Sequence, residues 1–194
     1  IKEFNKITKK YDAVRRCTNE GYDCEKIAIE KIKHFISKDA MNIDGLGKKV
    51  VENFWNLNMI RFPQDIYNLD YNKISNLEGW GKLSVSNLKY SIDQSKEVTL
   101  GRFLYAIGIR HIGIENAKLL AEHTKSIKNF FYFFYNNKLN DFLNIDGIGD
   151  TQINSLKKFF NNKLNLKVVE QLSSILNIQD EILNKHGKLL NNTF

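Results

Sequence analysis

The chain has 194 residues, which is enough for one or two domains with a buried core. Lys and Arg number 29 against 22 Asp and Glu, and the resulting charge of +7 favours a polyanionic partner. The apolar share of 42% excludes a disordered or collagen-like chain. The longest uncharged apolar stretch, near Phe130 to Tyr135, is too short to cross a bilayer, and the first residues lack a secretory pattern. These features exclude a membrane protein and predict a cytoplasmic location.

Helical spacing of the apolar residues dominates the chain, with one proline, Pro63, and little strand-like alternation. The sequence therefore predicts an all-α architecture. The aromatic run NFFYFFYNN at 129–137 is expected to pack in the core, because its rings surround a helix and do not form one stacking surface. The segment NIQDEILNKHGK at 177–188 is expected to be a polar link. Helices are predicted at 24–37, 65–72, 99–107, 127–143 and 166–176.

Glycines cluster in four short segments that share a register. The segments are hairpin 1 (43–47), hairpin 2 (77–81), hairpin 3 (109–113) and hairpin 4 (145–149). Counted from the last glycine of each, the residues at −4, −1, +4 and +7 are all apolar. At a 42% apolar background, sixteen such matches have a chance on the order of one in a million. The sixteen residues are Ile43, Leu46, Val51, Phe54, Leu77, Trp80, Val85, Leu88, Ile109, Ile112, Ala117, Leu120, Ile145, Ile148, Ile153 and Leu156.

Each repeat consists of a helix, a glycine hairpin and a second helix, so the sequence predicts a tandem array of four helix-hairpin-helix units. The third unit departs from the pattern, because His111 stands where the first glycine is expected. A helix that starts directly after a glycine presents unpaired backbone N–H groups and the positive end of its dipole. These groups suit a phosphate, and the missing Cβ lets the phosphate approach the backbone.

Cations follow three of the four hairpins or lie within them and can add charge to a bound phosphate. Hairpin 4 is followed by Asp150, so we expect it to bind more weakly or to serve packing. Since backbone contacts carry no base information, the predicted target is duplex DNA gripped across the minor groove without base preference. The candidate DNA-binding residues are Gly45, Gly47, Lys48, Lys49, Gly79, Gly81, Lys82, Gly108, Arg110, His111, Gly113, Gly147 and Gly149.

Cys17 and Cys24 are the two thiols of the chain, and two ligands do not close a tetrahedral zinc site. Three readings stay open from the residues alone: half of a four-Cys site, inert thiols, or a short-loop disulfide. The histidines form no site. His34 is expected to be packed, since it lies in a helical pattern beside Phe35, and His123 and His186 lack any neighbouring ligand pattern.

Catalytic motifs are missing, including a P-loop, GxSxG and the Lys-x-Asp-Gly in which a lysine could be adenylated. The segment IKHFISKDAMNIDGLGKKVVENFW at 32–55 closely resembles the first helix-hairpin-helix of bacterial NAD+-dependent DNA ligases. RFLYAIGIRHIG at 102–113 resembles the third repeat of that family. LEGWGKLSVSNL (77–88), Ser95–Lys96 and Phe159–Phe160 also match, so the resemblance covers roughly residues 15–165.

This resemblance implies an order of domains in the parent enzyme. An adenylation domain and an OB-fold precede a four-Cys zinc finger, four helix-hairpin-helix units and a BRCT domain. The chain would then contain a partial four-Cys zinc finger with the first helix (1–33), the helix-hairpin-helix DNA-binding domain (34–162), and a helix, linker and first strand of a truncated BRCT domain (163–194). Cys17 and Cys24 resemble the last two zinc ligands, separated here by six residues where about five are usual. The missing pair is expected just before residue 1.

The resemblance also implies a function. The parent enzyme would use NAD+ and Mg2+ to seal nicks in replication and repair, and this part would bind nicked double-stranded DNA as a monomer and be inactive alone. Two alternatives stay open. One is a helix-hairpin-helix module of another repair protein, of excision-nuclease or junction-binding type. The other is a purely structural helical scaffold.

Overall fold

The computed structural model describes residues 4–5, 9–11, 22 and 24–181. Within these ranges the chain is mostly helical, and no helix has the length and apolar run that a membrane span requires. The α-helices are α1 (Glu25–Phe35), α2 (Lys48–Asn56), α3 (Tyr71–Ser75), α4 (Lys82–Gln94), α5 (Leu100–Ala106), α6 (Ile114–Thr124), α7 (Ile127–Tyr135), α8 (Asp150–Asn161) and α9 (Lys163–Ile175). Two 3-10 helices, η2 (Pro63–Asn68) and η3 (Leu139–Asn144), and four short strands, β1 (Phe4–Asn5), β2 (Lys10–Tyr11), β3 (Glu97–Thr99) and β4 (Asn177–Gln179), complete the elements.

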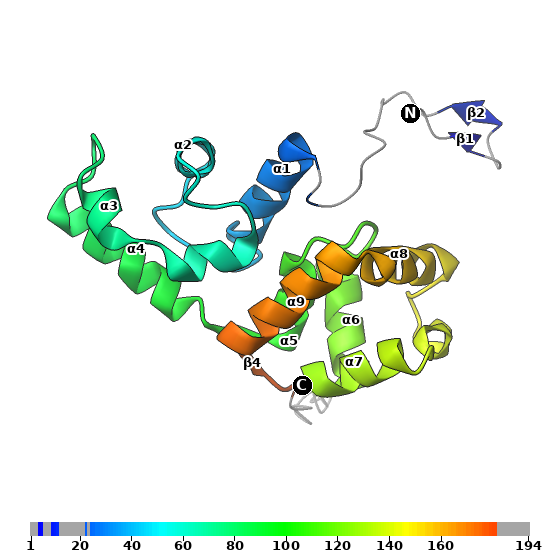
Figure 1. Ribbon diagram of the computed structural model, residues 1–194. Coiled ribbons are helices and arrows are strands. Elements are labelled where there is room, and N and C mark those ends of the chain that lie inside the picture. Colours follow the sequence, from blue (N-terminus) through cyan, green and yellow to red (C-terminus); the bar gives the residue numbers. More distant parts are fainter. Residues whose placement is uncertain (1–3, 6–8, 12–21, 23, 182–194) are drawn as a thin grey trace, which may run out of the picture.

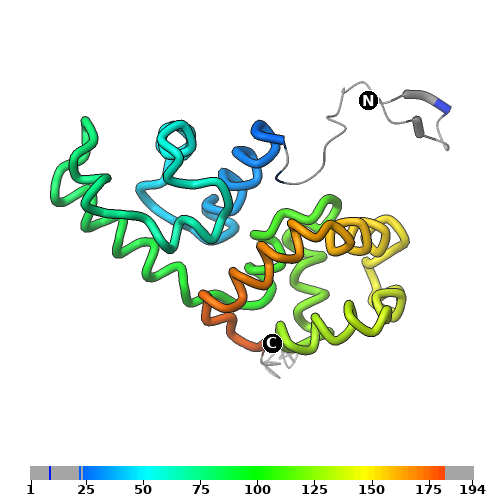
Figure 2. The backbone as a smooth tube through the Cα atoms, in the orientation of Figure 1, coloured from blue at the N-terminus to red at the C-terminus, as the bar shows by residue number. Residues whose placement is uncertain are grey.

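The helices form two groups that follow the order of the chain (Figure 1). The first half contains α1 to α4 with hairpins 1 and 2, and the second half contains α5 to α9 with hairpins 3 and 4. The backbone trace passes from one half to the other once through β3 (Figure 2). Helix α9 then returns across this junction and packs against both α8 and η2. The array is therefore closed by its last helix as well as by the chain connection.

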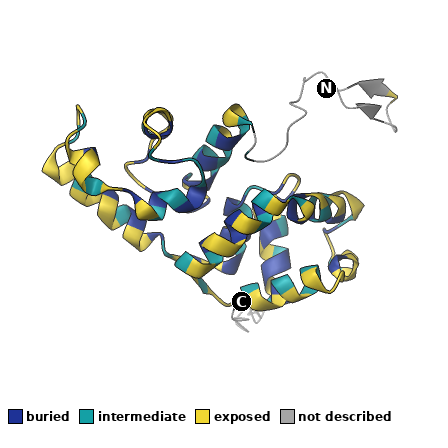
Figure 3. Cartoon of the chain, viewed as in Figure 1, coloured by how far each residue is buried: buried dark blue, intermediate teal, exposed yellow. Residues whose placement is uncertain are grey.

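Most of the apolar repeat positions lie in the core. Of the sixteen repeat positions, twelve are buried and four, Leu77, Trp80, Val85 and Ile145, are half-buried. All four residues at the +7 position have no exposed surface. The buried positions line the facing sides of the helices (Figure 3). Three of the four half-buried residues belong to the second unit, which lies at one end of the molecule and has fewer neighbours.

A small parallel sheet is an element that the sequence analysis missed. Strand β4 pairs with β3 in the register Val98 to Ile178, although residues 177–188 were expected to be a polar link. Val98 is 6% exposed, and Asn177 Nδ2 donates to Glu97 Oε2 at 2.8 Å. Three residues show too little alternation to predict a strand. Their pairing depends on α9, which delivers them to β3.

Two predicted helices are broken in the structure. The segment 65–72 is split between η2 and α3, because Leu69 is extended and the Asp70 carboxylate caps the start of α3. The segment 127–143 is split into α7 and η3, because Asn137 adopts φ +56°. Asparagine tolerates this left-handed conformation better than other side chains do. The helix predicted at 166–176 begins earlier, at Lys163, where Asn162 caps it.

The aromatic run packs mainly against the core, as predicted. Phe130 is fully buried, and Phe131, Phe133 and Phe134 are partly buried against the core. The two tyrosines of α7 differ. Tyr132 and Tyr135 are 48% and 56% exposed, and the Tyr135 hydroxyl donates to Glu170 Oε1 of α9 at 2.6 Å.

The domain boundary expected near residue 33 falls within α1, and the one expected near residue 163 falls at the start of α9. Helix α1 continues through residue 33, and its Ala28, Ile32 and Phe35 are buried in the common core. Helix α9 likewise buries Val168 and Leu172 in that core. Both helices are parts of the array, because their apolar faces have no other partner among the described residues.

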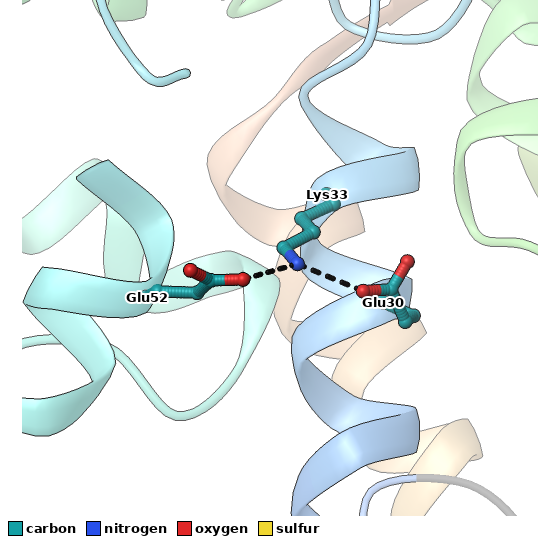
Figure 4. Close-up of polar contacts among 3 residues, drawn as sticks. All are labelled: Glu30, Lys33 and Glu52. Carbon is teal, nitrogen blue, oxygen red and sulfur yellow. Dashed lines mark hydrogen bonds and ion pairs between the residues drawn. The ribbon is translucent and has the colours of Figure 1, made fainter. Parts of the chain in front are cut away.

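A lysine connects the two helices of the first unit (Figure 4). Lys33 Nζ of α1 lies 2.8 Å from Glu30 Oε1 in the same helix and 2.7 Å from Glu52 Oε1 in α2. The hydrogen bonds to Glu30 and Glu52 raise the pKa of Lys33, and the hydrogen bond from Lys33 lowers the pKa of Glu52. The lysine thus stays charged and holds α1 beside α2.

Candidate nucleic-acid interface

The third residue of each hairpin has a left-handed backbone. Gly45, Gly79 and Gly147 have φ of +89°, +82° and +91°, and His111 takes the equivalent place in hairpin 3 with φ +62°. Glycine adopts this conformation without steric cost, whereas a side chain does so at a cost of about 1–2 kcal/mol. The turn itself explains these three glycines, so they need no ligand to account for them.

The last position of each hairpin is different. Gly47, Gly81 and Gly113 have φ of −68°, −93° and −81°, which any residue can adopt. A Cβ placed on any of the three would meet no atom of the described chain within 4 Å. Neither the backbone nor the packing inside the chain therefore calls for glycine there. The space in front of these residues is open to an external group.

These glycines also leave three helix starts without a side-chain cap. Among the described residues, no N-cap side chain accepts a hydrogen bond from the first turn of α2, α4 or α6. Four helices outside the hairpins have such caps, in which side-chain oxygens of Asp70, Thr99, Ser126 and Asn162 accept backbone N–H groups. The hairpin helices therefore expose N–H donors that the other four helices bond internally, and the dipole adds positive potential at the same place.

Charged side chains surround these helix starts unequally. Lys48 and Lys49 are exposed on the first turn of α2, and Lys82 is exposed on the first turn of α4. Arg110 is exposed in hairpin 3, but Glu115 lies on the first turn of α6. Hairpins 1 and 2 therefore have lysine on the helix start and an exposed acidic residue, Asp44 or Glu78, within the turn, whereas hairpin 3 has its cation within the turn.

Hairpin 4 has the same left-handed turn, but the backbone N–H of its last glycine is hydrogen-bonded within the chain. The Gly149 N–H donates to Gln152 Oε1 at 3.1 Å, and Asp150 occupies the first turn of α8. A Cβ on Gly149 would stand 3.6 Å from that Gln152 oxygen. That hairpin 4 binds an anion more weakly or serves packing stays a prediction.

Gly108 has a structural explanation. It ends α5 with φ +67°, and a Cβ there would lie 3.2 Å from Cδ2 of His34. His34 donates from Nε2 to the Tyr105 carbonyl at 2.8 Å and packs edge-on against the Tyr105 ring, so it is packed as predicted. His123 likewise lies among the rings of Phe133 and Phe142.

Residues outside the repeat register hold two hairpins in place, and the sequence analysis missed them. In the first half, the Asp44 N–H donates to Ser91 Oγ of α4 at 2.7 Å. In the second half, Asn116 Nδ2 of α6 donates to the Gly147 carbonyl at 3.1 Å. Each hairpin is braced by the second helix of another unit. Ser91 and Asn116 occupy different repeat positions, so the alignment of units has no signal for them.

The described residues do not by themselves form a metal site. Cys17 lies outside the described residues, and Cys24 stands at the start of α1. No group of three or more His, Cys, Asp or Glu side chains suited to a metal exists in the part of the chain that the structure describes. The half zinc site of Cys17 and Cys24 stays a prediction.

Comparison with known proteins agrees with this geometry. The helix-hairpin-helix motif family matches residues 102–169, which include hairpins 3 and 4. A protein named DNA ligase from Pelagibacter ubique is 61% identical over the whole chain, which covers 29% of that relative. DNA ligases from Rickettsia bellii and Rickettsia massiliae are 43% and 42% identical over 87% of the chain, which covers 26% of each. The chain thus spans somewhat more than a quarter of the length of these relatives.

The fold and the hairpins define a helix-hairpin-helix protein, built from four units around one core. The full-length similarity specifies the family further. The chain belongs to the bacterial DNA ligases and corresponds to one part of their length.

Proposed function

We propose that this chain is the part of an NAD+-dependent DNA ligase that grips duplex DNA beside a nick, through hairpins 1, 2 and 3. The observation that carries the proposal is the set of uncapped helix starts at Gly47, Gly81 and Gly113, each open where a Cβ would stand. The similarity to proteins named DNA ligase supports the same function.

The hairpins would bind the phosphate backbone. Exposed N–H groups donate to phosphate oxygens, the helix dipole favours the negative charge, and Lys48 and Lys82 add a cation beside the same position. None of these groups reads a base edge, so binding would be independent of sequence and would follow the minor groove, where two backbones lie close together. Hairpin 4 would contribute least.

In the proposed parent enzyme this chain supplies DNA binding, and the chemistry belongs to other parts. The sequence contains no Lys-x-Asp-Gly that could accept AMP from NAD+. NAD+ and Mg2+ would thus act elsewhere in the ligase, and the chain alone would be inactive. We further propose that it works as a monomer in the cytoplasm, and that zinc needs two ligands besides Cys17 and Cys24.

The structural-scaffold alternative differs in one testable respect. A scaffold needs a compact turn at each hairpin, and Gly45, Gly79 and Gly147 already satisfy that need. It offers no reason for glycine at Gly47 or Gly81, where a serine would cap the helix better. The choice of glycine at these positions favours DNA binding.

Serine substitutions separate binding from folding. In Gly47→Ser and Gly81→Ser, the new hydroxyl accepts the N–H groups of the first turn, so the melting temperature should stay equal or rise. The same hydroxyl occupies the donors and the space of the phosphate, so affinity for a nicked duplex should fall by about 1–3 kcal/mol per hairpin.

Gly149→Ser is the matched control, because Asp150 on the first turn of α8 disfavours a phosphate at hairpin 4. Its affinity should stay close to that of the parent chain in a fluorescence anisotropy titration. Serine variants that remain folded and bind DNA as well as the parent would disprove the phosphate grip.

A further inference from the structure

The two halves of the array are joined by hydrogen bonds that run in opposite directions between the first and third units. Arg102, on α5, donates from Nε to the Ala40 carbonyl and from Nη2 to the Lys38 carbonyl, both at 2.9 Å. Both carbonyls belong to the turn that leads from α1 into hairpin 1. A residue of the third unit therefore holds the turn that leads into hairpin 1.

A residue of the first unit likewise donates a hydrogen bond to the third unit. His34, on α1, donates to the Tyr105 carbonyl at the end of α5, four residues before hairpin 3 begins at Ile109. The same carbonyl accepts the Gly108 N–H at 3.1 Å, so the imidazole bonds the turn that ends the helix. The absence of a Cβ on Gly108 allows this contact, since that atom would stand 3.2 Å from the ring.

We infer that His34 and Arg102 are positioning residues, which lock hairpins 1 and 3 in one relative placement so that both engage a single DNA duplex. The inference rests on the proposed function and adds to it the residues that couple the two halves. A phosphate site on one half helps a site on the other only when their spacing is preset, because each unlocked hairpin must be ordered at the moment of binding.

The guanidinium of Arg102 has two possible roles that predict different results. As a phosphate ligand it would act through its charge, which lysine retains. As a brace it acts through two donors in a fixed planar fork, which lysine lacks. Arg102→Lys therefore keeps the charge and removes the brace.

The experiment uses the 194-residue chain and first measures hydrogen exchange without DNA. In Arg102→Lys, amides in residues 38–47 should exchange about tenfold faster, the scale of losing one or two hydrogen bonds. In His34→Phe, which keeps an aromatic ring against Tyr105, the acceleration should instead fall on residues 107–113. Unchanged exchange in both variants would overturn the brace whether or not the chain binds DNA.

The second measurement is affinity for a nicked duplex as a function of salt. Each variant should bind about three- to tenfold more weakly with the same salt dependence, because no phosphate charge is lost. The double variant should be little weaker than either single one, since both changes open the same lock. Arg61→Lys is the control for the exchange of Arg by Lys, as Arg61 lies over the Trp55 ring outside the hairpins.

The outcomes distinguish the two proposals. Faster exchange with parental DNA affinity would overturn the positioning role. A salt dependence weakened by one phosphate in Arg102→Lys would also overturn it, because Arg102 would then be a DNA ligand. Failure of the parent chain to bind DNA at low salt would overturn the proposed function, while the exchange data would still test the brace.

Discussion

Single glycines in this chain answer two different physical demands. At Gly45, Gly79 and Gly147 the backbone is left-handed, and glycine relieves a steric cost inside the molecule. At Gly47 and Gly81 the backbone is ordinary and an added Cβ would meet no atom of the described chain within 4 Å, so no demand inside the described molecule explains the glycine, and the proposed DNA contact would. Both kinds of position contain glycine, so the sequence alone does not separate them. Only the dihedral angles and the neighbours separate them.

The left-handed backbone of His111 allows a prediction about stability. It adopts φ +62° in the place that glycine fills in the other hairpins. Replacing it by glycine should stabilise the chain by about 0.5–1 kcal/mol, because relief of the left-handed strain exceeds the entropy that glycine loses on folding. Chemical denaturation measures this change. His111→Ala keeps the strain and serves as the control, and a glycine variant less stable than the alanine variant would contradict the prediction.

Lys31 makes a prediction about pH. Its ammonium lies 5.0 Å from the centre of the Phe159 ring and 5.3 Å from that of Tyr22, and burial lowers its pKa to about 8. The unfolded chain, with an ordinary lysine pKa near 10.5, then binds more protons than the folded chain between pH 8 and 10.5. The charged lysine therefore costs stability below pH 8, and this cost disappears as the pH rises through that window.

The variant Lys31→Met removes the buried charge and keeps most of the side-chain volume. It should be more stable than the parent at pH 7 by about 1–3 kcal/mol, since cation–π contacts offset part of the desolvation cost. The difference should shrink in urea titrations carried to pH 9.5. A difference that stays constant with pH would show that the ammonium is not desolvated.

At the scale of elements, each unit is one helix pair that buries a stripe of apolar residues against its neighbours. The +7 residue of every unit is fully buried, and it lies two turns beyond the hairpin glycine on the inward face. The opposite side of the same helix faces solvent. In α4, Leu88 is 0% exposed, whereas Leu83 is 73% exposed.

These two leucines give a matched pair within one helix. Leu88→Ala should destabilise the chain by about 2–5 kcal/mol, because it removes buried methyl groups and leaves a cavity against Gly45 of hairpin 1. Leu83→Ala should change stability by less than about 0.5 kcal/mol. Thermal or urea unfolding measures both. Equal effects would mean that α4 is not packed in the register described.

The elements that departed from expectation did so for local reasons. Asn137 stops α7 because it accepts a left-handed backbone, and Asp70 starts α3 because its carboxylate caps two N–H groups. Both residues are common in turns, and turn signals of this kind could have been read from the sequence. The pairing of β3 with β4 could not, since the two strands are separated by about eighty residues and six helices.

At the scale of the whole molecule, the 194-residue chain has a net charge of +7, and exposed lysines directly follow hairpins 1 and 2. A charge of this size predicts salt-dependent DNA binding only if lysines and arginines neutralise phosphates and so release the counterions condensed on the DNA. The arrangement of hairpins along one chain implies several phosphate contacts at once. The affinity for DNA should then fall as salt rises, and removal of each lysine should weaken this salt dependence separately.

If about six phosphates are neutralised, the logarithm of the binding constant should fall against the logarithm of salt with a slope of about −5. Lys48→Ala and Lys82→Ala should each reduce the magnitude of this slope by about one and leave the fold intact, since both side chains are exposed. Anisotropy titrations from 50 to about 300 mM salt, with circular dichroism of each variant, give the comparison. A slope unaffected by either lysine would place the phosphates elsewhere.

The sequence by itself determined the class of fold and the repeat. Helix periodicity and the hairpin glycines are local properties, and the same pattern recurs in every unit. Of the sixteen aligned apolar positions, twelve are buried in the structure. Tertiary structure alone decided how the units meet. Ser91, Asn116, His34 and Arg102 act on hairpins of other units, and such contacts depend on the placement of whole helices, which no repeat register encodes.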